Sequence, residues 1–270
     1  MRGRPPAMHS AFRAIWVTSY RELVRFYQDG ARVFSSFAMP VLFLFVFGNG
    51  FSHSIGSLVP GVDFLQFMYP GIIALIAFQT SLQSGLSVVW DREFGFLKEV
   101  LVAPLPRYGI VFGKALGIAI ISLFQGMVLL LLAPVVGVEL SISSILLLMP
   151  VLLLISLSIS GLGLLIASRM HSMSGFQMAT QLVVFPLMFA SGVFFPLNNV
   201  PAWLGALARI NPLTYGVDAV RHLFLGDDMA LQLGIQLLGR SLTFAGDLMV
   251  VAGIGAVFMT LAALTFGRRD

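Results

Sequence analysis

The sequence contains no cysteine and few charged residues. Without cysteine, disulfides, thiolate metal sites and cysteine nucleophiles are all excluded. Only 10% of the 270 residues are charged and 58% are hydrophobic, whereas a soluble domain is about 25% charged. Such a chain cannot fold as a water-soluble globule. Because a transmembrane helix needs about 20 apolar residues, the length suffices for six or seven spans and leaves no room for a large soluble domain.

The sequence also lacks the motifs of catalysis. It has no G-x-x-x-x-G-K-[ST] phosphate loop, since its one Gly-Lys pair, at Gly113, has neither the preceding glycine nor the following hydroxyl. We therefore expect that the chain is not an enzyme, hydrolyses no ATP and binds no cofactor or metal. The histidines lie in separated segments without an H-E-x-x-H spacing, which disfavours an integral-membrane lipid enzyme. The central thirds of the apolar segments hold no ionisable residue, which disfavours an ion-coupled secondary transporter.

Six apolar segments are long enough to cross a bilayer, at about 33–51, 67–89, 110–136, 145–167, 176–195 and 248–266. They predict an all-α polytopic membrane protein. Lysine and arginine favour the cytoplasmic side of a membrane. With six spans, thirteen of them fall on the side of the two termini and only Arg209, Arg221 and Arg240 on the other. Both termini are therefore predicted to be cytoplasmic.

Residues 1–32 precede the first apolar segment and show helical periodicity. Phe12, Trp16, Tyr20, Leu23 and Tyr27 recur at spacings of three and four residues, while Arg21 and Arg25 fall on the opposite face. An aromatic face with a basic rim is typical of a helix that lies in the headgroup region of a membrane. A solvated helix before the first span is the alternative.

The loop at 90–107 mixes acids, bases and aromatic side chains. Its segment REFGFLKEVLVAPLPR ends in two prolines that terminate a helix. We expect a short helix parallel to the membrane that docks onto a soluble partner. A structured turn without a partner is the alternative.

Two motifs resemble one family. REFGFLKEVLVAPLPR followed by GKALG, and SGVFFPLNNVPAWLGALARINPLTYGVDAVR at 191–221, are similar to stretches of ABC-2 type permeases, the membrane subunits of drug-resistance and lipo-oligosaccharide exporters. This resemblance implies an ABC-2 transmembrane domain at 33–270. It also implies two copies of a separate nucleotide-binding subunit that carries ATP and magnesium, and a second copy of the chain or a sister permease. The loop at 90–107 then acts as a coupling helix, through Arg92, Glu93, Phe94, Phe96, Leu97, Lys98 and Glu99.

The resemblance places the region 191–247 on the extracytoplasmic side, where the family has re-entrant helices. Prolines divide this region into short pieces, and aromatic rings suit the membrane interface. Asp218 and Arg221 lie three residues apart and are expected to pair on one helix face. The motif residues that we single out are Pro196, Trp203, Asn211, Pro212, Tyr215, Asp218 and Arg221.

Several polar residues lie inside the apolar segments. They either join helices by hydrogen bonds or line a substrate path, and the candidates for a path are Gln79, Gln83, Gln177, Gln181, Phe185 and Phe189. Gly113 and Gly117 form a G-x-x-x-G pair that allows helices to approach closely. Lys114 is expected to extend to the cytoplasmic headgroups.

Together these observations predict the permease subunit of an ATP-driven exporter in a bacterial inner membrane. We expect an amphipathic drug or lipid-like substrate, with a glycolipid or polysaccharide as the alternative. Lipids are the expected surroundings, and no nucleic acid is expected as a partner. The charges that raise the isoelectric point lie at the predicted membrane edges.

Overall fold

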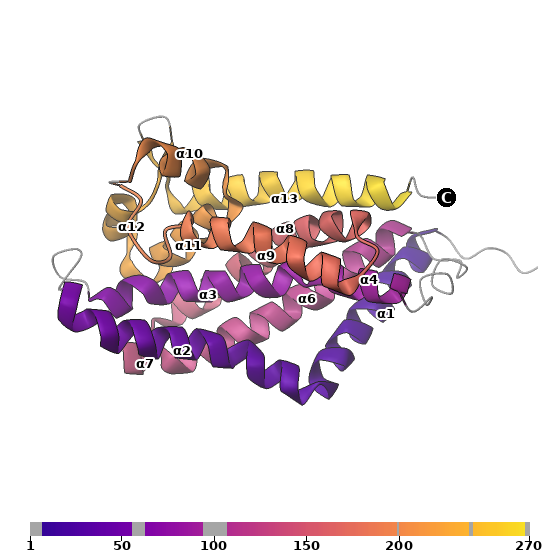
Figure 1. Ribbon diagram of the computed structural model, residues 1–270, viewed down its shortest axis with the longest axis horizontal. Coiled ribbons are helices and arrows are strands. Elements are labelled where there is room, and N and C mark those ends of the chain that lie inside the picture. Colours follow the sequence, from indigo (N-terminus) through magenta and orange to yellow (C-terminus); the bar gives the residue numbers. More distant parts are fainter. Residues whose placement is uncertain (1–6, 56–62, 94–106, 199, 238–239, 268–270) are drawn as a thin grey trace, which may run out of the picture.

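The computed structural model describes residues 7–55, 63–93, 107–198, 200–237 and 240–267 (Figure 1). These residues are almost entirely helical. The helices are α1 (Ala7–Gln28), α2 (Gly30–Ile55), α3 (Phe64–Leu82), α4 (Ser84–Glu93), α6 (Arg107–Leu129), the short η1 (Leu130–Leu132), α7 (Ala133–Val136), α8 (Ile142–Arg169), α9 (Met173–Phe189), α10 (Ala202–Ile210), α11 (Pro212–Leu225), α12 (Asp227–Leu233) and α13 (Phe244–Gly267).

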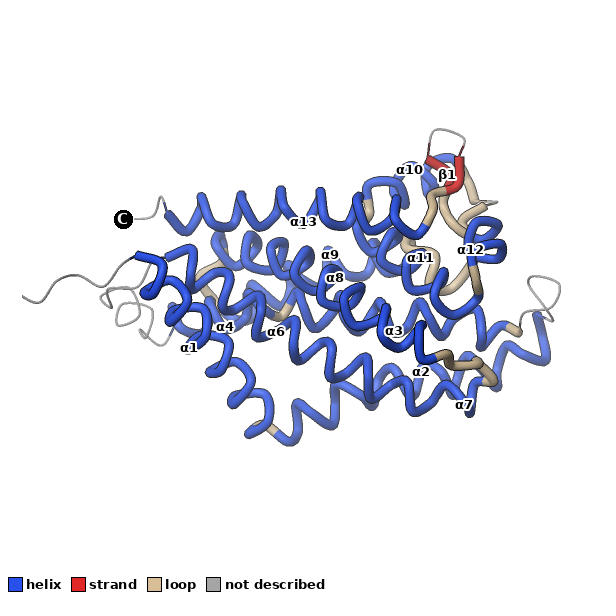
Figure 2. Tube along the Cα trace, turned by 180° about the vertical axis from the view of Figure 1, so that it is seen from behind, coloured by secondary structure: helices blue, strands red, loops and turns tan. Residues whose placement is uncertain are grey.

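The long helices run roughly along one axis of the molecule. Figure 1 shows α10, α11 and α12 gathered at one end, whereas α4, the beginning of α1 and the end of α13 lie at the other end. Two strands of two residues each, β1 (Gln236–Leu237) and β2 (Arg240–Ser241), form an antiparallel hairpin beside α10 and α12 (Figure 2). The sequence did not predict this hairpin, because two-residue strands have no periodicity.

The apolar segments of the sequence are helical over most of their length, although the second and third are divided between consecutive helices. Four helical stretches are long and apolar enough to cross a membrane, at 64–93, 109–136, 142–169 and 244–265. A fifth is present if α1 and α2, which meet at an angle of 79°, count as one broken span. Helix α9 has 17 residues and is shorter than these. The described residues therefore form a mainly helical bundle with four to five candidate membrane spans.

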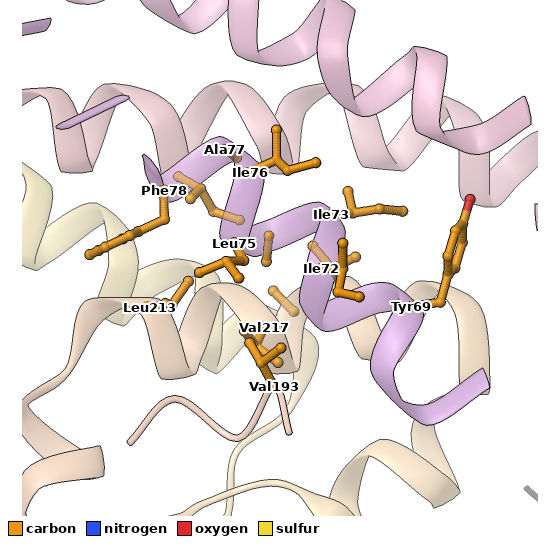
Figure 3. Close-up of a cluster of buried hydrophobic side chains, with 14 of the residues drawn as sticks. Tyr69, Ile72, Ile73, Leu75, Ile76, Ala77, Phe78, Val193, Leu213 and Val217 are labelled. Carbon is orange, nitrogen blue, oxygen red and sulfur yellow. The ribbon is translucent and has the colours of Figure 1, made fainter. Parts of the chain in front are cut away.

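Helix α3 forms the centre of the bundle. It is apolar on all sides, as expected of a helix that is surrounded by others, and its side chains from Phe67 to Phe78 are all buried. Figure 3 shows Leu213, Val217 and Val193 packed beside it. The hydroxyl of Tyr69 donates to the carbonyl of Leu129 at 2.8 Å, so the polar end of this buried ring is satisfied.

The predicted close approach at the G-x-x-x-G pair is confirmed. A Cβ atom added at Gly113 would lie 2.8 Å from the carbonyl oxygen of Ile15, and one at Gly117 would lie 2.9 Å from that of Ser19. Helix α1 therefore lies directly against the backbone of α6. The hydroxyl of Ser19 donates to the carbonyl of Gly113 at 2.8 Å, which ties the two helices together at this point.

The fifth apolar segment differs from its predicted limits. The sequence predicts a span over 176–195, but α9 begins at Met173 and ends at Phe189. Residues beyond it form turns, and Gly192 has a φ of 79°, a left-handed conformation that most residues avoid. The chain therefore leaves the helix earlier than hydropathy alone indicates.

Candidate functional site

A group of charged side chains lies where α1, α4 and α6 meet. The ammonium of Lys114 is 3.0 Å from Asp91 and 3.3 Å from Glu22, and it donates to the hydroxyl of Ser87 at 2.7 Å. Arg21 reaches the same Asp91 carboxylate at 2.6 Å. We call Glu22, Asp91 and Lys114 with Arg21 the charge cluster. It joins three helices through a single buried lysine.

The prediction that Lys114 extends to the headgroups is wrong. Its side chain is only 2% exposed, and the two acids beside it are equally buried. The physical reason is the glycine pair that flanks it, because α1 approaches α6 so closely that Lys114 is enclosed. An enclosed ammonium needs charged partners, and Glu22 and Asp91 supply them.

Helix α1 presents its two faces as the sequence pattern indicates. Trp16 is 66% exposed and Tyr20 is 61% exposed, so the aromatic face points outward. Arg21 and Arg25 do not form a free rim, because both guanidinium groups contact Asp91, at 2.6 and 3.5 Å. The aromatic face of α1 is therefore free to contact the surroundings of the protein, while the basic face attaches α1 to α4.

The last residues of α4 attach it to a second pair of helices. Arg92 donates to the carbonyl of Met170 at 2.5 Å, at the end of α8. The carboxylate of Glu93 accepts from the backbone N–H of Met173 at 2.9 Å, at the start of α9. Both contacts suit the dipoles of the helix ends, since cations favour a C-terminus and anions an N-terminus. The end of α4 thus contacts α1, α6, α8 and α9.

Five of the seven predicted coupling residues lie outside the described residues. They are Phe94, Phe96, Leu97, Lys98 and Glu99. Arg92 and Glu93 are the two that the structure describes, and both lie at the point where α4 ends.

A cavity of about 290 Å³ lies between α2, α3 and α9. Of the predicted path residues, Gln79, Gln83, Gln181 and Phe185 line it, and Gln177 lines an adjoining hollow. Phe189 does not line either hollow. Its ring contacts that of Phe194, which does, at a centroid distance of 5.5 Å. Five of the six side chains predicted from the sequence therefore line this cavity or the hollow beside it.

The side chains of these glutamines do not act as links between helices in the part of the chain that the structure describes. Thr80 and Gln125 make the interhelical bond instead, at 2.7 Å. The amide oxygen of Gln83 and the hydroxyl of Thr180 are both buried without a hydrogen-bond partner. A buried polar group without a partner costs about 1–3 kcal/mol, and both of these groups line the cavity.

The motif at 191–221 forms a second polar cluster, on α11. The predicted pair of Asp218 and Arg221 is confirmed, at 2.7 Å. Arg221 also donates to the carbonyl of Gly192 at 2.8 Å, and its guanidinium lies 4.6 Å from the centroid of the Phe67 ring. Asp218 accepts from the backbone N–H of Ile235 at 3.0 Å. This pair therefore attaches α11 to the turn after α9 and to the chain before β1.

The neighbouring motif residues stabilise the same helix. Asn211 caps α11, since its side chain accepts from the N–H of Leu213 at 3.0 Å, and Pro212 begins the helix. Tyr215 donates to the carbonyl of Arg209 at 2.5 Å. Pro196 lies in the turn after α9, and Trp203 is exposed on α10.

Sequence reasoning missed Glu22, Asp91 and Ser87 as members of a site. Asp91 and Lys114 lie at the same end of two successive apolar segments, and this opposite charge at one membrane depth is the signal that would have indicated a pair. Thr180 gave no signal, because a single threonine in an apolar helix is common. Within the described ranges, no three acidic or histidine side chains are grouped closely enough to hold a metal ion.

The sequence of the chain is similar to those of several known proteins. A family model described as "ABC-2 type transporter" matches residues 13–225. The chain is similar to ycf38 of Cyanophora paradoxa, which is named as a transport permease, with 32% identity over 195 residues that cover 70% of this chain and 67% of the relative. YbhR of Escherichia coli K12, named as a probable multidrug ABC transporter permease, is 30% identical over 62% of this chain and 46% of YbhR. YadH of the same strain, an inner membrane transport permease, is 25% identical over 80% and 83% of the two chains.

Proposed function

The chain belongs to the ABC-2 type transporter family, and on this premise we propose that it is the permease subunit of an ATP-driven exporter. As a permease of this family, it is a membrane subunit that works with an ABC ATPase subunit. Beyond the family assignment, we propose the direction of transport, the class of substrate and the number of subunits. The attachment of α4 to four other helices is the observation that carries the proposal, because a force applied to the segment 94–106 after α4 would reach all of them.

The proposed topology has six spans and two cytoplasmic termini. Helices α2, α3–α4, α6–α7, α8, α9 and α13 are the spans, and α10, α11 and α12 form the re-entrant region within 191–247. In support, the beginning of α1 and the end of α13 lie at the same end of the molecule (Figure 1). The outward aromatic face of α1 supports its assignment as an interface helix over 1–32.

Coupling is proposed to enter through 90–107, which joins α4 to α6. The ATPase subunit, present in two copies and carrying ATP and magnesium, would contact this segment from the cytoplasm. A displacement of α4 would then act on α9 through Glu93, and α9 is a wall of the cavity that holds Gln181 and Phe185. The chain thus contains a short physical connection between the proposed ATPase contact and the proposed substrate path.

The proposed assembly contains a second copy of the chain or a sister permease. Large apolar side chains point outward on both α2 and α9, among them Phe34, Leu42, Met178, Leu182 and Phe189. In a membrane such a surface contacts lipid or another apolar helix. We propose an amphipathic drug or lipid-like substrate, which suits a cavity lined by apolar and amide side chains. The name of YbhR refers to drugs, and this supports the same class.

Copurification tests the proposal directly. The chain, tagged at its C-terminus, is isolated from native membranes in mild detergent, and copurifying proteins are identified by mass spectrometry. We expect an ABC ATPase subunit in equal amount, with ATP hydrolysis that vanadate inhibits. Isolation of the chain without such a subunit, under conditions that preserve a known ABC-2 complex processed in parallel, would contradict the proposal.

A further inference from the structure

Three hollows lie in a row along α2. The first, of about 240 Å³, is lined by α1, α4 and the start of α2. The second, of about 370 Å³, shares Arg32, Gln83 and Leu86 with the first. The third is the cavity of about 290 Å³ between α2, α3 and α9, and it shares Gln79 and Gln83 with the second. Since Gln83 lines all three, we treat them as one continuous groove, the α2 groove.

The chemistry of the α2 groove changes steadily along its length. The first hollow is lined by charged side chains, including Arg25 and Arg32. The second is lined by hydroxyl and amide groups such as Ser36, Thr80 and Gln125. The third is lined mainly by apolar side chains, namely Phe43, Ile72, Leu75, Ile76, Val184, Phe185, Met188 and Phe194. This order, from charged to polar to apolar, is that of an amphiphile.

The groove is slightly longer than one membrane leaflet. Its wall on α3 and α4 runs from Trp90 to Ile72, which at 1.5 Å per residue is roughly 27 Å. One leaflet contributes about 15 Å of hydrocarbon, with a headgroup layer beyond it. An amphiphile with its head at α1 and its tail at Phe194 would therefore have the depth and orientation of a lipid in a single leaflet.

The charges in the first hollow favour an anion. Glu22 is already paired with Lys114, so its charge is neutralised. Asp29 accepts from the backbone N–H of Arg32 at 3.0 Å and is the remaining acid of the hollow. The guanidinium of Arg25 lies 3.5 Å from Asp91, whereas that of Arg32 has no carboxylate within ion-pair distance among the residues that the structure describes. In and beside this hollow, the four cations Arg21, Arg25, Arg32 and Lys114 outnumber the three acids Glu22, Asp29 and Asp91, so one positive charge is left for a ligand.

Two unsatisfied polar atoms lie where a ligand would change from head to tail. The hydroxyl of Thr180, on a side chain only 7% exposed, and the amide oxygen of Gln83 both line the third hollow and have no hydrogen-bond partner. A hydroxyl or ester group beside an apolar tail would satisfy the Thr180 hydroxyl, and a hydroxyl would satisfy Gln83. These atoms are an observation independent of the charges.

We propose that the α2 groove binds a single-chain lipid with an anionic headgroup, which enters sideways from the cytoplasmic leaflet. The head lies between Arg25 and Arg32, the linking group at Gln83 and Thr180, and the tail against Phe43 and Phe185. One tail rather than two suits the modest volume of each hollow. This inference rests on the proposed function, since it assigns the substrate class of the same cavity.

Photolabelling tests the inference without the ATPase subunit. The purified chain in nanodiscs is exposed to lysophosphatidic acid with a diazirine at the end of its tail, and separately to a monoacylglycerol with the same tail. We expect label on α2 and α9 near Phe43 and Phe185, with about fivefold more from the anionic probe. Excess unlabelled lysophosphatidic acid should compete.

Three variants identify the parts of the groove. Arg32→Gln should abolish the preference for the anionic probe while the labelled peptides stay the same. Arg13→Gln, which removes an equal charge from an exposed position of α1, should leave the preference intact. Val184→Trp should fill the third hollow and reduce labelling by both probes. A thermal unfolding midpoint close to that of the unmodified chain shows that each variant is folded.

Several results would overturn the inference. They are equal labelling by the two probes, label spread over the outward face of α13, or crosslinks that join two copies of the chain across α2 and α9 in place of lipid label. An ATPase subunit that copurifies and hydrolyses ATP, together with equal labelling, would reject the lipid site alone. If the anionic probe labels the chain selectively but no ATPase subunit copurifies, the proposal of an ATP-driven exporter is rejected and the lipid site is retained.

Discussion

Lys114 and Asp91 lie 3.0 Å apart, although one begins the third apolar segment of the sequence and the other ends the second. Both side chains are almost completely buried, and Glu22 on α1 completes the contact. Two acids thus meet three cations, Lys114, Arg21 and Arg25, at the point from which the proposed coupling segment starts. A buried group of charges specifies one arrangement of helices, because any displacement leaves a charge unpaired.

Replacing Lys114 by methionine is expected to destabilise the protein strongly. The change leaves Glu22 buried without a cation, and loss of one partner of a buried pair costs about 3–5 kcal/mol. Thermal unfolding in detergent measures this, with Arg13→Gln as a control that removes an exposed charge. Adding Glu22→Gln to Lys114→Met should restore part of the loss. An unchanged unfolding midpoint for Lys114→Met would show that the cluster is not a structural element.

Alanine at Gly117 should separate α1 from α6. The new Cβ would lie 2.9 Å from the carbonyl oxygen of Ser19, which is closer than backbone atoms tolerate, and overpacking costs about 1–3 kcal/mol. Gly253→Ala is the matched control, because it lies in α13 with no atom within 4 Å of its added Cβ. There, alanine should be neutral or slightly stabilising. Unfolding midpoints of the two variants give the comparison, and equal values would argue against the close approach of α1.

Local patterns were sufficient for much of the architecture. The apolar segments are helical over most of their length, and the Asp218–Arg221 pair followed from a three-residue spacing on one helix face. The glutamines of the cavity were found because polar side chains inside apolar segments are rare. In these cases the relevant partners are close in sequence or share a single helix.

Contacts between distant helices were not predictable in the same way. The enclosure of Lys114 depends on how closely α1 approaches α6, and no periodicity within either helix contains that information. The break between α3 and α4 at Gln83 was missed for a similar reason, since the hydropathy of the segment continues through it. Gln83 is nevertheless the residue shared by all three hollows, so the break matters for the site.

Loss of Arg221 should weaken the attachment of α11. Its guanidinium contacts Asp218, the carbonyl of Gly192 and the ring of Phe67. In Arg221→Met the buried Asp218 carboxylate keeps the backbone N–H of Ile235 as its hydrogen-bond donor among the described residues. We expect a loss of about 3 kcal/mol or more, measured by chemical unfolding in detergent. Arg209→Gln, at an exposed position on α10, should have little effect. Equal stability of the two variants would contradict the structural role of the pair.

Variants of Glu93 separate an effect on coupling to the ATPase subunit from an effect on the stability of the protein. Its carboxylate holds the first N–H of α9 at 2.9 Å, and α9 carries Gln181 and Phe185 of the cavity. Glu93→Lys places a positive charge at a helix N-terminus, which repels it, whereas Glu93→Gln keeps an oxygen acceptor. A hydrogen bond to a charged group contributes about 1.5–3 kcal/mol. The lysine variant should therefore reduce about tenfold the extent to which the chain stimulates ATP hydrolysis by the copurified ATPase subunit. The glutamine variant should retain most of it.

The same charge reversal at Glu139, an exposed residue between α7 and α8, is the matched control and should leave the stimulation unchanged. Membrane levels of all three variants should equal that of the unmodified chain, because Glu93 lies at a helix end rather than within the charge cluster. If Glu93→Lys stimulates the ATPase as fully as Glu139→Lys does, then the contact between α4 and α9 does not transmit the force. The charge cluster of α1, α4 and α6 and the contact of Arg92 with the end of α8 would then be the remaining connections described between the coupling segment and the rest of the bundle.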